Sequence, residues 1–118
     1  MTSNEADPLP IREYHAHVYY TPETRADAAL VREGIEARFT ARLGRWHDLP
    51  IGPHTRGMYQ VLFAADQFAR IVPWLMLNRR GLDVLVHPDT GDDLADHTRH
   101  ALWLGQPLSL RLEALQDH

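Results

Sequence analysis

Histidine is the residue type that stands out in this sequence. The 118 residues include eight histidines, where average usage would give roughly two or three. They are scattered along the chain and form no terminal run: His15, His17, His47, His54, His87, His97, His100 and His118. Imidazole is the commonest metal ligand in proteins and the usual general base near neutral pH. The excess therefore indicates metal-ion or acid–base chemistry.

Two of these histidines are separated by a single residue in a segment typical of a β-strand. Residues 12–20 are rich in aromatic and β-branched side chains, which favour strands. Because side chains alternate along a strand, His15 and His17 share one face, roughly 6–7 Å apart along the backbone. Two rings so placed can converge on one metal ion, or one can bind it while the other has an acid–base role. A pair of surface histidines on an edge strand is the alternative.

Three more histidines follow elements that fix their direction. His54 ends a turn bounded by Pro50 and Pro53, a stiff connection. His87 closes a short apolar strand and precedes a proline; for it and for His54 a purely structural role is an equal alternative. His97 follows Asp96 in an acidic segment, which indicates a role in substrate contact or in supporting a metal site.

The order of expected elements defines the fold class. We expect strands at residues 12–20, 45–49, 58–65, 82–86 and 108–112, and helices at about 22–44, 67–78 and 93–104. The leading βαββαβ order predicts an α+β, ferredoxin-like domain with an antiparallel sheet and two helices on one face. In that topology the first strand is central, between the third and the fourth.

Strand alternation predicts which face of this sheet carries the histidines. His15, His17 and His87 fall on the face that the two helices leave free, and His54 arrives on the loop before the third strand. Tyr19 and Leu85 fall on the same face. Since these two would otherwise be exposed, we expect a second copy of the chain to cover this face, forming a homodimer.

Composition limits the remaining possibilities. We expect a disordered arm over residues 1–11 and a single domain over residues 12–118. With no cysteine, disulfides and thiolate metal sites are excluded, and a reducing cytoplasm is the expected location. The net charge of −4 with no basic stripe argues against a nucleic-acid partner. The longest apolar stretch, residues 71–77, contains Pro73 and is too short to span a membrane.

Several motifs in order resemble one known family. The matching segments are residues 14–20 (YHAHVYY), 51–54 (IGPH), 73–75 (PWL), 82–93 (LDVLVHPDTGDD), 96–98 (DHT) and 101–105 (ALWLG). Over residues 12–105 the chain resembles the DOPA 4,5-dioxygenase-like family of small ring-cleaving enzymes. The resemblance implies a ferredoxin-like fold, usually dimeric, and extradiol cleavage of a catechol such as DOPA with iron(II) and O₂.

The resemblance also bears on the site. Its histidine motifs point to His15, His17, His54 and His87 as the metal and active-site set. We predict that His17, His54 and His87 bind one divalent metal, and that His15 and His97 are catalytic. Imidazole suits iron(II) and zinc alike, so only the resemblance favours iron. Metal binding is expected to weaken as pH falls through about 6, near the ordinary pKa of histidine.

The chain departs from the family pattern at two positions. Thr55 stands where a proline is expected, and Gln60 stands where the family often has an acidic residue. The arrangement of two histidines and one carboxylate that is usual for non-haem iron oxygenases therefore has no obvious carboxylate here. The alternative function is a non-catalytic, dimeric module that binds a metal or a small ligand.

Overall fold

A computed structural model describes residues 11–115 of the chain as an α+β fold. Its elements, in chain order, are β1 (Glu13–Tyr20), α1 (Arg25–Arg38), β2 (Arg42–Leu43), β3 (Gly57–Ala64), η1 (Ala65–Gln67), α2 (Phe68–Asn78), β4 (Val84–Pro88), α3 (Asp93–Asp96), β5 (Leu102–Leu104) and η2 (Leu112–Leu115). The two η elements are single 3₁₀ turns. The expected arm lies, apart from Ile11, outside the described residues.

The strands form one antiparallel sheet in the order β2-β3-β1-β4-β5. The first strand is central, as the ferredoxin-like topology requires, and the predicted fold class is confirmed. In the register of β1, His15 lies opposite His87 of β4, and His17 lies opposite Gln60 of β3. The histidines of β1 and β4 therefore come side by side on one face.

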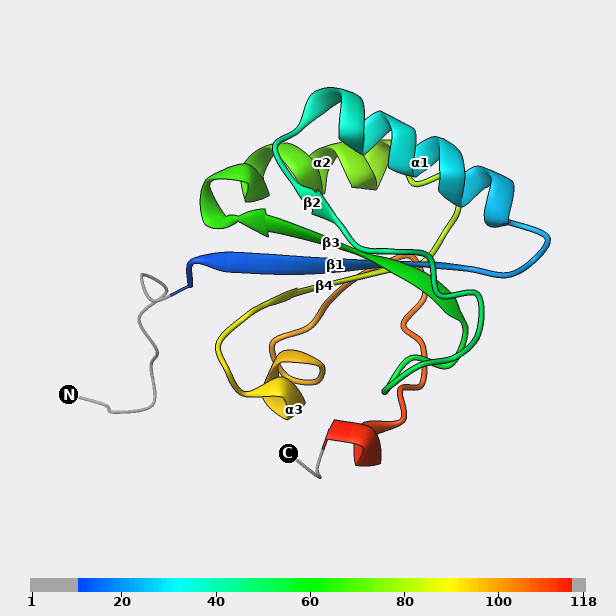
Figure 1. Cartoon of the computed structure of the whole chain (residues 1–118). Helices are drawn as coiled ribbons and strands as arrows, with labels where there is room; N and C mark the ends of the chain where they lie inside the picture. The colour runs from blue at the N-terminus through cyan, green and yellow to red at the C-terminus, as the bar shows by residue number, and fades with distance from the viewer. Residues whose placement is uncertain (1–10, 116–118) are drawn as a thin grey trace.

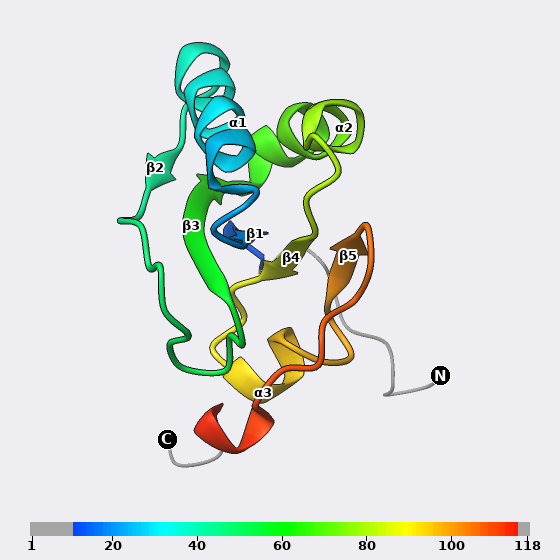
Figure 2. The same ribbon diagram turned by 90° about the vertical axis from the view of Figure 1, so that its right-hand side faces the viewer.

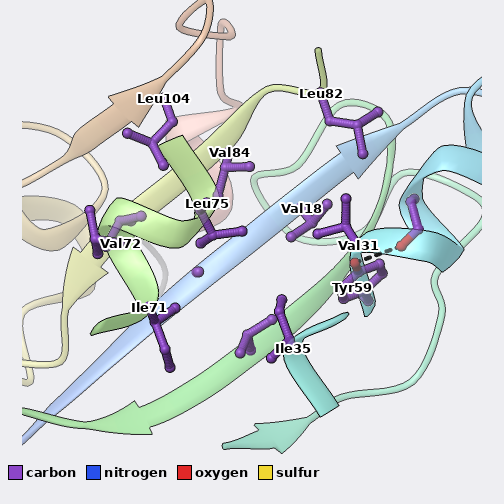
Figure 3. Close-up of a cluster of buried hydrophobic side chains, with 14 of the residues drawn as sticks. Val18, Val31, Ile35, Tyr59, Ile71, Val72, Leu75, Leu82, Val84 and Leu104 are labelled. Carbon is purple, nitrogen blue, oxygen red and sulfur yellow. Dashed lines mark hydrogen bonds between the residues drawn. The ribbon is translucent and has the colours of Figure 1, made fainter. Parts of the chain in front are cut away.

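The two long helices cover the other face of the sheet (Figures 1 and 2). Alternate strand residues such as Val18, Val61 and Val84 are buried beneath Ile35 of α1 and Leu75 of α2, as Figure 3 shows for part of this core. Fully burying one such side chain stabilises the fold by about 1.5–3 kcal/mol. The sheet that positions the histidines is thus held rigidly from its helical side.

The face opposite the long helices is covered by the C-terminal part of the same chain, where α3 and η2 lie (Figure 1). Tyr19 and Leu85 are 1% and 0% exposed, because Trp103, Leu108 and Leu110 pack against them. These two residues therefore need no second copy of the chain to bury them, and their expected exposure as the reason for a dimer is wrong. The segment that buries them lies in the same chain.

The C-terminal elements differ from those expected. The helix expected at residues 93–104 is a single turn, α3, and Leu102–Leu104 instead pairs with β4 as β5. The strand expected at residues 108–112 does not form; Leu108 and Leu110 pack on the sheet face instead of pairing at its edge. Both segments are short and rich in leucine, and it is residues 102–104 that pair with the edge of β4.

The second strand also lies elsewhere than expected. The strand expected at residues 45–49 lies at Arg42–Leu43, while His47 makes only an isolated bridge to Met58. None of the helices between residues 11 and 115 is long and apolar enough to cross a membrane.

Candidate metal centre

Four histidine rings gather on the sheet face opposite the long helices, and we call them the histidine cluster. The members are His17 of β1, His54 of the loop before β3, His87 of β4 and His97, which directly follows α3. Ring centroids lie 4.3 Å apart for His17 and His54, 5.1 Å for His17 and His87, and 4.3 Å for His87 and His97. His17, His54 and His87 are only 4–5% exposed, and His97 is half-buried.

A tight turn places His54. The His54 backbone N–H donates to the carbonyl oxygen of Ile51 at 3.0 Å, and Gly52 between them has a φ of +56°. That left-handed conformation favours glycine, because a Cβ would clash with the backbone. The IGPH segment therefore folds back on itself and directs His54 into the cluster.

A buried carboxylate anchors the segment that carries His97. Asp96 is 1% exposed, and its oxygens accept hydrogen bonds from the Thr90 backbone N–H (2.9 Å), the Thr90 hydroxyl (2.6 Å) and His100 Nδ1 (3.0 Å). It is the one acidic side chain buried in the part of the chain that the structure describes. Its oxygens are thus engaged in holding α3 against the end of β4.

Oxygen atoms of the chain fix the proton positions on two cluster histidines. His87 Nδ1 lies 2.8 Å from the carbonyl oxygen of Pro88, and His97 Nδ1 lies 2.7 Å from that of Asp93. A carbonyl oxygen can only accept, so each Nδ1 carries the proton and donates it. In a neutral ring the lone pair is then on Nε2, the atom available to a metal.

His17 has incomplete contacts among the described residues. Its Nε2 lies 3.0 Å from His87 Nε2, and since that nitrogen of His87 holds a lone pair, a proton or a cation must lie between the two. Its Nδ1 is buried without a hydrogen-bond partner, which costs about 1–3 kcal/mol in an otherwise satisfied interior. A cation bound beside His17 and His87 would accept nitrogen lone pairs that have no other partner among the described residues.

Three of the four rings are close enough to share one ion. One nitrogen each of His17, His54 and His97 lies within 4.8 Å of the other two. His87, expected as the third ligand, is not part of this group, although its Nε2 lies 3.0 Å from His17 Nε2. His97, expected to be catalytic, thus lies among the potential ligands. No carboxylate belongs to this group, so a metal held here would have imidazole ligands from the chain.

His15 shares the face of the cluster but has partners of its own. Its Nε2 lies 3.0 Å from Glu13 Oε2, and its Nδ1 lies 2.9 Å from Gln60 Nε2. Its ring meets that of His87 edge-on, with centroids 5.2 Å apart. Gln60, at the position where the family often has an acidic residue, therefore contacts His15.

Burial keeps three of the cluster histidines, His17, His54 and His87, uncharged. Desolvation, helped by the neighbouring histidines, lowers the pKa of His54 to about 4. Desolvation likewise lowers the pKa of His87 to about 4 and that of His17 well below its ordinary value. Near neutral pH these rings are therefore neutral imidazoles, the form that binds metals.

The sequence predicted no part in the metal site for Tyr19, whose hydroxyl oxygen lies 2.6 Å from His54 Nδ1. Desolvation raises the pKa of Tyr19 above its ordinary value, so the phenol keeps its proton. The sequence did indicate, through the alternation of side chains along the strand, that Tyr19 lies on the same sheet face as the histidines. Its contact with a loop 35 residues further along the chain could not be deduced from that alternation.

The fold and the cluster together define a class: an α+β protein with a buried, histidine-lined site able to hold a divalent metal. Residues 14–114 match the model of the Dopa 4,5-dioxygenase family, and the chain belongs to this family. The suspected resemblance is thereby confirmed.

Individual relatives agree with that assignment. The chain is 36% identical over 115 residues to an uncharacterised 21.2 kDa protein of Botryotinia fuckeliana, covering 87% of this chain and 63% of that one. It is 34% identical over 114 residues to the DOPA 4,5-dioxygenase of Amanita muscaria, covering 89% and 50%. The chain thus spans only half to about two thirds of these two relatives.

A solved structure matches over nearly its full length. The crystal structure of a candidate dioxygenase from Nostoc punctiforme superposes with a TM-score of 0.95 at 56% identity, covering 96% of this chain and 98% of that one.

Proposed function

We propose that this protein is an iron(II)-dependent extradiol dioxygenase that opens the ring of a catechol-type substrate with O₂. The observation that carries the proposal is the group of three buried imidazoles, His17, His54 and His87, in a chain that belongs to a dioxygenase family. The Amanita relative is named a DOPA 4,5-dioxygenase, which makes DOPA and related catechols the first substrates to test.

The metal would be held by the histidine cluster. We propose His17, His54 and His87 as ligands; the three are buried, and His87 Nε2 lies 3.0 Å from His17 Nε2. His97, which is half-buried and forms the group of mutually close nitrogens with His17 and His54, would be a fourth donor. When bound, the ion would supply a place where catechol oxygens and O₂ meet and where negative charge is stabilised. Since His97 is only half-buried, it is also the cluster member most accessible to a substrate.

Other residues of the chain would control protons and water. Gln60 Nε2 donates to His15 Nδ1, which leaves the proton of a neutral His15 on Nε2, facing Glu13. We propose His15, beside His87 but bonded outside the cluster, as the residue that holds or moves a proton during the reaction. The apolar group of Tyr19, Leu85 and Trp103 would keep water from that side of the site.

The decisive experiment combines metal analysis with a substrate panel. Protein purified without a tag is loaded anaerobically with iron(II) and then given catechols, DOPA among them, in oxygenated buffer. We expect O₂ consumption in equal amount to a ring-opened product for at least one catechol. Iron-loaded protein that binds the metal but opens no catechol ring would refute the proposed reaction.

One observation favours a second candidate function, a zinc-binding module without catalysis. The donor group contains histidine alone, a set that zinc uses readily, whereas non-haem iron oxygenases usually add a carboxylate. On this reading the purified protein retains zinc in stoichiometric amount, and the iron-loaded form consumes no O₂ with any catechol.

The homodimer implied by the family resemblance stays a prediction. Its interface would have to lie away from Tyr19 and Leu85, which are buried within the chain. Sedimentation at tens of micromolar protein, an order-of-magnitude choice that detects weak interfaces, tests it. A single monomeric species would contradict it.

A further inference from the structure

The hydroxyl of Tyr19 is the only oxygen that contacts His54 Nδ1 among the hydrogen bonds of the described chain, at 2.6 Å. That contact occupies Nδ1, so only Nε2 of His54 remains to bind a metal in the cluster. An imidazole that binds through Nε2 must carry its proton on Nδ1. The Tyr19 oxygen then has to accept this proton in a hydrogen bond, which a phenol can do.

The same arrangement recurs on two other members of the cluster. The Nδ1–H groups of His87 and His97 donate to the carbonyl oxygens of Pro88 and Asp93. Three of the four cluster histidines thus have Nδ1 held by an oxygen of the chain. Metal-binding histidines generally donate their second N–H in this way, which fixes the ring and increases its basicity as a ligand.

Packing holds the Tyr19 hydroxyl in place. The ring is stacked on Trp103 of β5, with centroids 5.9 Å apart, and it packs with Met58 and Leu85 in a buried apolar group. At 1% exposure, Tyr19 has no surface to offer a substrate. Its hydroxyl can act on the site only through His54.

We infer that Tyr19 is a positioning residue for the metal centre, whose hydroxyl accepts the Nδ1–H of His54 and presents the Nε2 lone pair of His54 to the ion. The inference rests on the proposed metal site. It adds a residue to that site, taken from the strand that already carries His17, and it links the C-terminal covering segment to metal binding.

The test compares Tyr19→Phe with Tyr20→Phe. The control removes the hydroxyl of the next residue, which is also buried but lies on the helix-covered face and donates to Asp48 at 2.8 Å. Zinc is the probe because it has no redox chemistry, and its dissociation constant is measured by competition with a chelator. We expect Tyr19→Phe to bind zinc about 10–100-fold more weakly, as for loss of other such partners, and Tyr20→Phe to bind as the unchanged protein does.

A second readout separates positioning from general damage. In nitrogen-15 NMR of the zinc-loaded protein, the His54 Nδ1 proton should be present and slow to exchange. In Tyr19→Phe it should exchange fast while those of His87 and His97 persist. Equal zinc affinity of the two variants, or a zinc-loaded protein with the His54 proton on Nε2, would overturn the inference while leaving the metal site intact. A wild-type protein that binds neither zinc nor iron would overturn the proposed site and this inference together.

Discussion

Single residues decide whether the histidine cluster is ready for a metal. His54 and His87 are neutral near pH 7 because burial lowers their pKa values to about 4. The orphaned Nδ1 of His17 and the close approach of its Nε2 to His87 leave contacts that a cation would complete. Burial and unmatched lone pairs therefore favour metal binding without any charged ligand.

Removing a proposed ligand should abolish tight metal binding. Loss of a residue that merely orients a ligand typically weakens affinity 10–100-fold, so His17→Ala and His54→Ala should each weaken iron(II) or zinc binding by more than about 100-fold. Metal content and chelator competition measure this. His47→Ala is the matched control, because His47 lies outside the cluster and pairs with Met58 through its backbone. Variants at positions 17 and 54 that keep full metal would contradict the site.

A substitution at His15 should separate proton transfer from metal binding. His15→Gln retains a polar side chain near Glu13 and Gln60 but cannot carry a proton between them. We expect unchanged metal content and a kcat lowered by about 10²–10⁴-fold, the usual contribution of a general acid or base. Steady-state kinetics on the best catechol, with metal analysis of the same sample, give both numbers. A loss of metal instead would place His15 among the ligands.

At the scale of elements, the short segments after β4 complete the site. The turn α3 brings His97 to the cluster, and β5 with the residues after it buries Tyr19. Asp92 caps α3 by accepting the Ala95 backbone N–H at 3.0 Å, and Asp96 binds the segment to Thr90 and His100. These hydrogen bonds fix the position of the segment that carries His97, although this segment is not part of the sheet.

Asp96→Ala should therefore loosen both the fold and the metal site. It leaves the Thr90 groups without their buried acceptor, so the free energy of unfolding should fall by about 1–3 kcal/mol, and metal affinity should fall with it as His97 moves. Denaturant unfolding and chelator competition measure the two effects. Asp93→Ala removes an exposed carboxylate from the same turn and should change neither. An Asp96→Ala protein with unchanged metal affinity would show that α3 needs no such anchor.

At the scale of the whole molecule, burying several histidines couples stability to pH. The pKa values of His54 and His87 are lowered from 6.5 to about 4 in the folded protein, so between these pH values the unfolded chain binds more protons. Stability is therefore full above about pH 7 and is lost as pH falls from 6.5 towards 4. Protons should likewise compete with a metal for these imidazole nitrogens only at a pH lower than the value of about 6 that is expected for an ordinary histidine.

The metal-free protein should show this loss directly. By about pH 5, each of the two histidines should have lowered the free energy of unfolding by on the order of 2 kcal/mol, since one pKa unit corresponds to about 1.4 kcal/mol. Urea unfolding at pH 7 and pH 5 in the presence of a chelator measures it. A variant lacking one of the two histidines should lose less over the same interval. Equal stability at both pH values would contradict the burial of neutral rings.

Local patterns in the sequence determined much of this protein. Strand alternation is a property of the backbone itself, so the face shared by His15, His17 and His87 follows once the strands are recognised. The order of the elements likewise predicts the central place of β1, which the sheet confirms. The tight IGPH turn was also visible, because proline and glycine restrict the backbone locally.

Only the tertiary structure decided how the rest of the chain completes the site. The choice of Leu102–Leu104 as the edge strand, the cover that Leu108 and Leu110 place over Tyr19, and the approach of His97 to His87 all depend on contacts between segments distant in sequence. Short segments of this kind have little intrinsic preference for strand or loop. Their conformation therefore depends on contacts with the edge of β4 and with the sheet face that the long helices leave free. The hydrogen bond between His54 and Tyr19 likewise exists only because a loop and a strand meet in space.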